Sequence, residues 1–159
     1  MRTRTFLVAL PLMGLLMLAG ALGAQAQAPW YGTWKLNLAK SRFSPGPAPK
    51  SQTVKIEPWE NGLKGTNDTV TAEGETRHSE VSGKFDARDN PVTGNPNVDT
   101  EAFRRANEHT FVIFSKKGGK ATTTTRVQVS TDGKTTTATV RGKDAQGQAV
   151  NTVAIYDRQ

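Results

Sequence analysis

Apolar and polar residues alternate along most of this chain, and this alternation restricts the possible folds more than any other sequence feature. In residues 30–38, small or apolar residues occupy every second position, among them Trp34 and Leu36. The same alternation recurs in residues 121–130 and 134–141, where β-branched Thr and Val are frequent. A period of two residues is typical of a half-buried β-strand. Beyond the N-terminal region, no stretch has the spacing of an amphipathic helix.

Short glycine-containing segments separate these strand-like runs at the spacing of β-hairpins. Five such segments occur: Glu60–Gly62, Ala72–Glu75, Lys116–Lys120, Thr131–Lys134 and Asp144–Gln148. Glycine supplies the positive φ of tight turns, and connections this short join antiparallel strands only. The sequence therefore predicts an all-β, antiparallel up-and-down meander of about 8–10 strands. Closure into a small barrel would remove its unpaired edges; a β-sandwich or an open curled sheet is the alternative.

Two segments interrupt the alternation. Residues Ser41–Ser51 hold three prolines and a glycine, which predicts a loop or an extended lid. Residues Phe85–Thr100 are predicted to form the longest irregular connection.

The N-terminal region has the pattern of a cleaved secretory signal. Arg2 and Arg4 precede an apolar run of residues 6–22, and small residues follow, so cleavage is expected after Ala26 or Ala28. A retained membrane anchor is the alternative, and the A-x-A ending disfavours it. We expect residues 1–28 to be the signal and residues 29–159 to be one soluble exported domain, periplasmic or extracellular. We expect no membrane span in that domain, and the chain contains no cysteine that could carry a lipid or form a disulfide.

The chain is basic, with a formal charge of +7. Residues 1–28 contain two basic and no acidic residues, so the mature domain would carry +5. The basic residues are scattered, and the cluster Lys116, Lys117 and Lys120 flanks a predicted hairpin tip. This distribution favours an ordinary solvated surface, and no nucleic-acid partner is expected.

Several short motifs resemble those of the calycin superfamily. Gly32–Thr33–Trp34 resembles the G-x-W motif of lipocalins, and "GTWKL" is similar to the start of many fatty-acid-binding proteins. The whole of residues 30–159 resembles a group of small exported bacterial lipocalin-like proteins, mostly of unknown function. That group shares "GTWKLNxAKSxFSPGPAPK" and "PVTGNPxxDT" with this chain. The resemblance implies a small calycin-like barrel.

The resemblance also implies particular residue roles. Fatty-acid-binding proteins hold the ligand carboxylate with an Arg-x-Tyr pair on the last strand; Tyr156 matches the tyrosine, but Ala154 replaces the arginine. Lipocalins place an arginine from a late strand over the G-x-W tryptophan. Three arginines are candidates for this role: Arg126, Arg141 and Arg158. The alternation places the first two on the outward face.

Four residues are candidates for ligand binding: Trp34, Phe111, Ile113 and Tyr156. Trp34 would close a barrel floor beneath a ligand, or would simply be a core aromatic residue. The run Phe111–Phe114 is apolar on both faces, so it would line a cavity and meet a lid or partner, or form a strand buried on both sides.

No catalytic or metal-binding motif is present. His78 and His109 are the only histidines, and neither lies in a recognised metal motif, so we expect structural or surface roles for them. Asp and Asn residues gather in the long connection, but their spacing is not that of a calcium loop, and we expect them to build turns. The members of this set are Asp86, Asp89, Asn90, Asn95 and Asp99. We therefore expect no enzyme activity, cofactor or metal.

Two functions fit these observations. The first is non-catalytic binding of a small apolar or amphipathic molecule inside an exported lipocalin-like barrel. The alternative for such a barrel is a filled interior, because its few large apolar residues are just enough to occupy the space inside a small barrel. The second is a structural or interaction role in the envelope, with threonine-rich faces that bind a cell-wall polymer or another protein.

Overall fold

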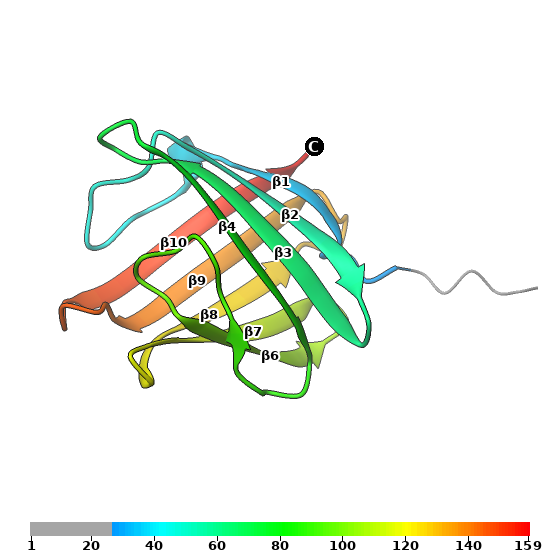
Figure 1. Ribbon diagram of the computed structural model, residues 1–159. Coiled ribbons are helices and arrows are strands. Elements are labelled where there is room, and N and C mark those ends of the chain that lie inside the picture. The colour runs from blue at the N-terminus through cyan, green and yellow to red at the C-terminus, as the bar shows by residue number, and fades with distance from the viewer. Residues whose placement is uncertain (1–26) are drawn as a thin grey trace, which may run out of the picture.

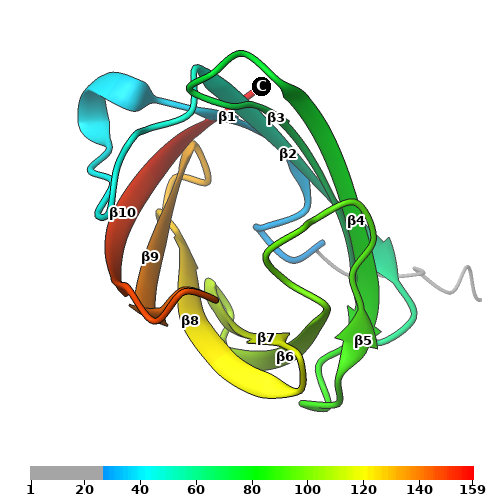
Figure 2. The same ribbon diagram turned by 60° about the vertical axis from the view of Figure 1, so that its left-hand side comes forward.

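The computed structural model describes residues 27–159 and shows an all-β protein with one short 3₁₀ turn. Ten strands form one antiparallel sheet that curls into a nearly closed barrel (Figures 1 and 2). The strands are β1 (Gly32–Leu36), β2 (Ser51–Trp59), β3 (Gly62–Val70), β4 (Thr76–Lys84), β5 (Asn90–Pro91), β6 (Thr100–Asn107), β7 (Thr110–Lys117), β8 (Lys120–Val129), β9 (Thr135–Lys143) and β10 (Ala149–Arg158). The predicted all-β meander is confirmed, and the barrel is compatible with a calycin-like fold. The predicted signal lies outside the described residues, except for its last two.

The sheet follows the chain in order except at one place, where the first strand pairs with the last. The strand order is β4-β3-β2-β1-β10-β9-β8-β7-β6-β5. The end strand β4 is joined to the segment that follows β5 by an isolated bridge, at which Glu80 and Thr93 exchange backbone hydrogen bonds of 3.1 and 3.0 Å. The barrel therefore has a seam between β4 and the residues that follow β5, held by this bridge instead of a full ladder.

All five predicted turns connect adjacent antiparallel strands, as the glycine spacing indicated. A sixth turn, between β6 and β7, contains no glycine. Its backbone is fixed by Asn107, whose Oδ1 accepts a hydrogen bond of 2.9 Å from the amide of His109.

The proline-rich segment after β1 runs beside β10 instead of forming a free loop. A 3₁₀ turn, η1 (Leu38–Lys40), leads the chain away from β1, which pairs with β10 only through Tyr156–Arg158. Arg42 then bridges to Val153, and the amide of Asn151 donates a 2.7 Å hydrogen bond to the carbonyl of Ser44. The start of this segment thus extends the wall along the part of β10 that β1 leaves unpaired.

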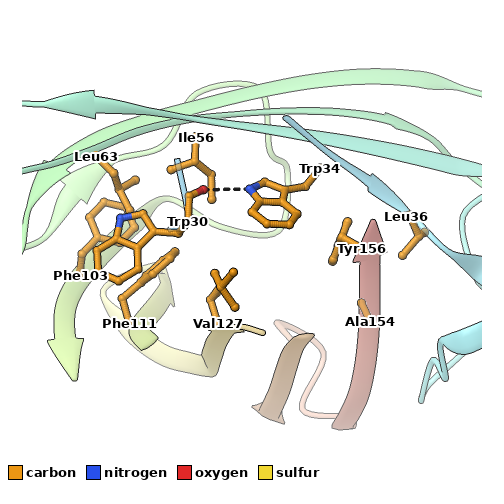
Figure 3. Close-up of a cluster of buried hydrophobic side chains, with 11 residues drawn as sticks. Trp30, Trp34, Leu36, Ile56, Leu63, Phe103, Phe111, Val127, Ala154 and Tyr156 are labelled. Atoms are coloured by element: carbon orange, nitrogen blue, oxygen red, sulfur yellow. Dashed lines mark hydrogen bonds between the residues drawn. The ribbon is translucent and has the colours of Figure 1, made fainter. Parts of the chain in front are cut away.

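Aromatic residues close one end of the barrel. Trp30, in the segment before β1, is 1% exposed and packs edge-on against Phe85 and Phe111, with ring centroids 5.7 and 5.4 Å apart. Its carbonyl accepts a 2.8 Å hydrogen bond from the indole nitrogen of Trp34 (Figure 3). Phe103, which is fully buried, completes this floor. The strand β7 is buried on both sides here, because Val112 on its outer face is also buried.

Arg158 fixes the N-terminal segment against this floor. Its guanidinium carbon lies 4.2 Å from the centre of the Trp34 ring. Its nitrogens donate hydrogen bonds to the carbonyls of Tyr31, at 2.9 Å, of Gly133, at 2.6 Å, and of Pro29. Of the three candidate arginines, Arg158 is the one that stacks on the tryptophan, whereas Arg126 and Arg141 are exposed on the outer face.

We predict that Arg158→Lys lowers the free energy of unfolding by about 2 kcal/mol. An ammonium group cannot stack as a plane on the indole and also reach three separate carbonyls. The control is Arg141→Lys on the exposed face of β9, which should change stability by less than about 0.5 kcal/mol. Urea denaturation of both variants measures the difference; equal stabilities would contradict this role for Arg158.

We predict that Gly94→Ala weakens the seam. Gly94 has φ +74°, and a Cβ there would overlap the backbone carbonyl oxygen of His78 on β4. Gly118 also has a positive φ, +56°, but a Cβ there would meet nothing within 4 Å, so Gly118→Ala is the matched control. The control should cost about 1–2 kcal/mol for its backbone conformation alone, and Gly94→Ala should cost clearly more.

Amide hydrogen exchange locates this effect. Exchange at Glu80 and Thr93 should accelerate in Gly94→Ala and stay unchanged in Gly118→Ala. Unchanged protection at the seam in Gly94→Ala would show that the loop does not hold the barrel closed there.

Candidate functional site

The barrel encloses a cavity of about 410 Å³. Side chains from the strands and from two loops line it. Its apolar wall consists of Trp34, Val54, Ile56, Leu63, Val81, Phe103, Phe111, Ile113, Val127, Ala138, Val140 and Ala154. Protein sites for small ligands have volumes of about 300–1,000 Å³ and mostly apolar walls, so this cavity lies within their range. The low apolar content left open whether the interior would fill itself, and the structure shows that it does not.

The four candidate residues from the sequence all line this cavity. Trp34 lies at the floor, on top of Arg158, and Phe111 and Ile113 follow one another along the inner face of β7. Tyr156 lies on the inner face of β10. Both readings of Trp34 are compatible with its position, because it is 1% exposed and also borders the cavity. The structure brings the four residues together, and their role in binding stays a prediction.

Two loops border the cavity at the end opposite the aromatic floor. Phe43 comes from the proline-rich segment, and Val92, Asn95 and Val98 come from the connection that follows β5. The floor lies at the end where the N-terminal segment joins β1, whereas these loops lie at the end of the β9–β10 turn (Figure 1). We call this second end the mouth. The sequence placed both loops as irregular segments, but nothing in their composition indicated which side chains face inward.

Glu101 is an acidic side chain that faces the cavity. It lies on the inner face of β6, two residues before Phe103, and its backbone pairs with Ser115 of β7. The hydroxyl of Ser115 donates a long hydrogen bond of 3.4 Å to its carboxylate. Burial raises the pKa of Glu101 from 4.5 to about 7, and the bond from Ser115 opposes this rise only in part.

Sequence reasoning missed Glu101. The residue belongs to "DTEAFRRANE", a stretch rich in helix-forming residues. An acidic residue in such a stretch is expected to be exposed to solvent. The pairing of β6 with β7 turns it inward, in phase with the buried Phe103.

A polar pair crosses the cavity wall between β10 and β2. The hydroxyl of Tyr156 donates a 2.6 Å hydrogen bond to Oε1 of Gln52, and the amide nitrogen of Gln52 donates to Thr69 at 3.2 Å. Burial raises the pKa of Tyr156, so its hydroxyl stays protonated and serves as a neutral donor. The hydroxyl of Thr136 also lines the cavity, is buried, and has no hydrogen-bond partner in the described part of the chain.

The fatty-acid-binding arrangement is missing from this wall. Ala154, at the position of the expected arginine, is 3% exposed and lies against the cavity. No Lys, Arg or His is among the described residues that line the cavity. A ligand carboxylate would therefore meet no cation here, and it would share the interior with Glu101.

His78 lies on the outer surface, away from the cavity. Its ring nitrogens are 2.6 Å from a carboxylate oxygen of Asp68 and 3.1 Å from one of Glu80. These two hydrogen bonds, Asp68 first, raise the pKa of His78. Lys64 lies 3.5 Å from the other oxygen of Glu80, so the group forms an exposed network of charges.

In the long connection Phe85–Thr100, the side-chain oxygens of the Asp and Asn residues accept hydrogen bonds that form turns and ion pairs. Asp86 and Asn95 each accept a hydrogen bond from the amide two residues on, as turn-building residues do. Asp89 and Asp99 accept hydrogen bonds from Lys116 and Lys117 at 2.7 and 2.6 Å. In residues 27–159, no group of three or more His, Asp or Glu side chains is placed to hold a metal ion.

Comparisons with known proteins do not assign the chain to a family. No protein-family model matches the chain, and no curated protein matches it either. Within the described residues, no helix has the length and apolar character needed to cross a membrane.

We predict that Glu101→Gln stabilises the protein by an amount that grows with pH. Between pH 4.5 and about 7 the folded protein holds a proton on Glu101 that the unfolded chain has lost, so wild-type stability falls as pH rises through this window. Glutamine removes this loss. The variant should match wild type near pH 4 and exceed it by up to about 3 kcal/mol at pH 8.

The matched control is Glu57→Gln. Glu57 lies on the outer surface 2.8 Å from Lys55, and removal of this exposed pair should change stability by less than about 1 kcal/mol. Urea denaturation of the three proteins from pH 4 to 8 measures the differences. A Glu101→Gln difference that does not increase with pH would contradict a buried, uncompensated carboxyl.

Proposed function

We propose that this protein is an exported, non-catalytic carrier that holds a small apolar or amphipathic molecule inside its barrel. The observation that carries the proposal is the cavity of about 410 Å³ between an aromatic floor and a mouth bordered by loops. Side chains can fill the interior of a barrel of about eight strands. This barrel has ten strands, and six of the cavity-lining positions on β8, β9 and β10 hold the small residues Thr or Ala, which leave part of the added space unfilled: Thr123, Thr125, Thr136, Ala138, Thr152 and Ala154.

Two further observations support a lipocalin-like identity. The first is the G-x-W sequence on β1, and the second is the stack of Arg158 on Trp34, which matches the arrangement the resemblance implies. Both lie at the floor, where they seal the barrel and leave the interior open. Together with the N-terminal signal pattern, they support a carrier that acts outside the cytoplasm.

A structural or interaction role in the envelope is the second candidate. It is favoured by the outward threonines of β8 and β9, which include Thr124, Thr137 and Thr139. The lysines of the nearby hairpin tip contribute less to such a surface than their number suggests, because Lys116 and Lys117 pair with Asp89 and Asp99. This role would require no open interior.

We predict that the protein binds N-phenyl-1-naphthylamine, a neutral apolar dye whose fluorescence rises in apolar surroundings, in one saturable site. Ala138→Phe should weaken this binding at least about tenfold. Ala138 faces the cavity, and a phenyl ring there would occupy space that the dye needs. Ala149→Phe makes the same change at an exposed position of β10 and should leave the affinity unchanged.

Native mass spectrometry of protein purified from its own host provides a second readout. We expect a co-purifying molecule of low mass that is lost in Ala138→Phe. A clean apo mass, together with no saturable dye binding, would overturn the carrier function. Salt-sensitive retention of that apo protein on cell-wall fractions would then support the envelope role.

A further inference from the structure

The charge of the cavity is one-sided. Glu101 contributes a carboxyl group to its lining, and no basic side chain among the described residues lines the same space. Glu80 is also among the residues that line the cavity, but its carboxylate is exposed and lies beside His78 and Lys64. An ion placed in the cavity would therefore meet Glu101 without a competing cation.

The groups packed around Glu101 leave its carboxylate poorly satisfied. From β7, Ser115 supplies the long 3.4 Å bond. From β5, the side chain of Asn90 donates to the backbone carbonyl of Glu101 and not to its carboxylate. The neighbouring lysines Lys116 and Lys117 bond to Asp89 and Asp99, on the outer surface. A carboxylate can accept about four hydrogen bonds, so several acceptor positions of Glu101 remain for a ligand.

The other polar groups of the wall do not offer a second charged partner. Tyr156 and Gln52 are hydrogen-bonded to each other. Thr136, with its unpartnered hydroxyl, is neutral. The strongest polar interaction available to a ligand is therefore a charge-assisted hydrogen bond to Glu101.

The position of Glu101 along the barrel separates a polar end from an apolar one. Strand β6 begins at the mouth, so Glu101 lies nearer the loops and Phe103 lies deeper. Trp34 and Phe111 form the floor beyond (Figure 3). A molecule with a charged head at Glu101 would thus have its apolar body against aromatic rings.

We infer, building on the proposed carrier function, that the cavity selects an amphipathic amine, with the protonated nitrogen paired with Glu101 and the apolar body on the aromatic floor. The same geometry rejects fatty acids. Their carboxylate would lie beside Glu101 and would find no cation, because Ala154 replaces the arginine that fatty-acid-binding proteins use.

Binding of such an amine is linked to a proton. The free protein carries a partly protonated Glu101 near neutral pH, because burial raises its pKa to about 7. The ammonium favours the ionised form, so amine binding expels the proton that Glu101 holds. Amine affinity should therefore rise as pH increases from 5.5 to 8, a range in which an alkylammonium of pKa about 10 stays charged.

Three probes with the same ten-carbon tail test the inference: decylamine, decanol and decanoate. Each displaces N-phenyl-1-naphthylamine from wild type, Glu101→Gln and Glu57→Gln at pH 8, below micellar concentrations. Wild type and Glu57→Gln should bind decylamine at least about tenfold more tightly than decanol, with decanoate weakest. Glu101→Gln should bind decylamine about tenfold or more weakly than wild type and should bind decanol and the dye as wild type does.

The affinity of wild type for decylamine as a function of pH provides a second test, which requires no substitution in the protein. Decylamine affinity should fall several-fold from pH 8 to 5.5, and decanol affinity should stay constant. Decanoate bound as tightly as decylamine, undiminished decylamine binding by Glu101→Gln, or a flat pH series would each overturn the amine preference. None of these results would contradict the carrier function. That function is contradicted only if the protein shows neither saturable dye binding nor a co-purifying ligand.

Discussion

The stack of Arg158 on Trp34 is the contact on which the closed end of the barrel depends. One guanidinium covers the indole face and binds carbonyls of Pro29, Tyr31 and Gly133. It thereby joins the last strand, the β8–β9 turn and the N-terminal segment. With that segment held, Trp30 lies inside the barrel and forms the floor. The depth of the cavity depends on this cation, because without the sealed floor water would enter the barrel from both ends.

Most of the fold could be predicted because its physical causes are local. Strict alternation specifies which side chains face inward, and glycine-bearing turns specify which strands are neighbours. Gly133, in the β8–β9 turn, is an example of the second kind, and Val127, which faces inward on β8, is an example of the first. The turn at Asn107 escaped prediction because it contains no glycine and is held instead by a hydrogen bond from the amide of His109 to the side chain of Asn107. The closure at Glu80 and Thr93 escaped it because those residues meet only when the curvature of all ten strands has accumulated.

The site was predictable only in its apolar part. Trp34 and Tyr156 could be proposed because they match motif positions of the calycin superfamily, and Phe111 and Ile113 because they belong to a run of large apolar residues on a predicted strand. Glu101 could not, since an acidic residue at such a position normally faces water, and only its pairing with Ser115 and its phase with Phe103 turn it toward the cavity. The charged residue of the cavity, Glu101, therefore occupies a position where the sequence alone predicts an exposed side chain.

The seam gives the barrel wall an uneven strength. Around most of its circumference, neighbouring strands are joined by ladders of seven or more paired residues, as between β9 and β10. At Glu80 and Thr93 the wall is joined by two hydrogen bonds, and the connection that includes Val92 and Val98 borders both this joint and the cavity. Parting these two bonds would widen the mouth sideways without disturbing the floor. The width of the cavity on this side is therefore set by a loop and two hydrogen bonds, whereas on most other sides it is set by the ladders of the sheet.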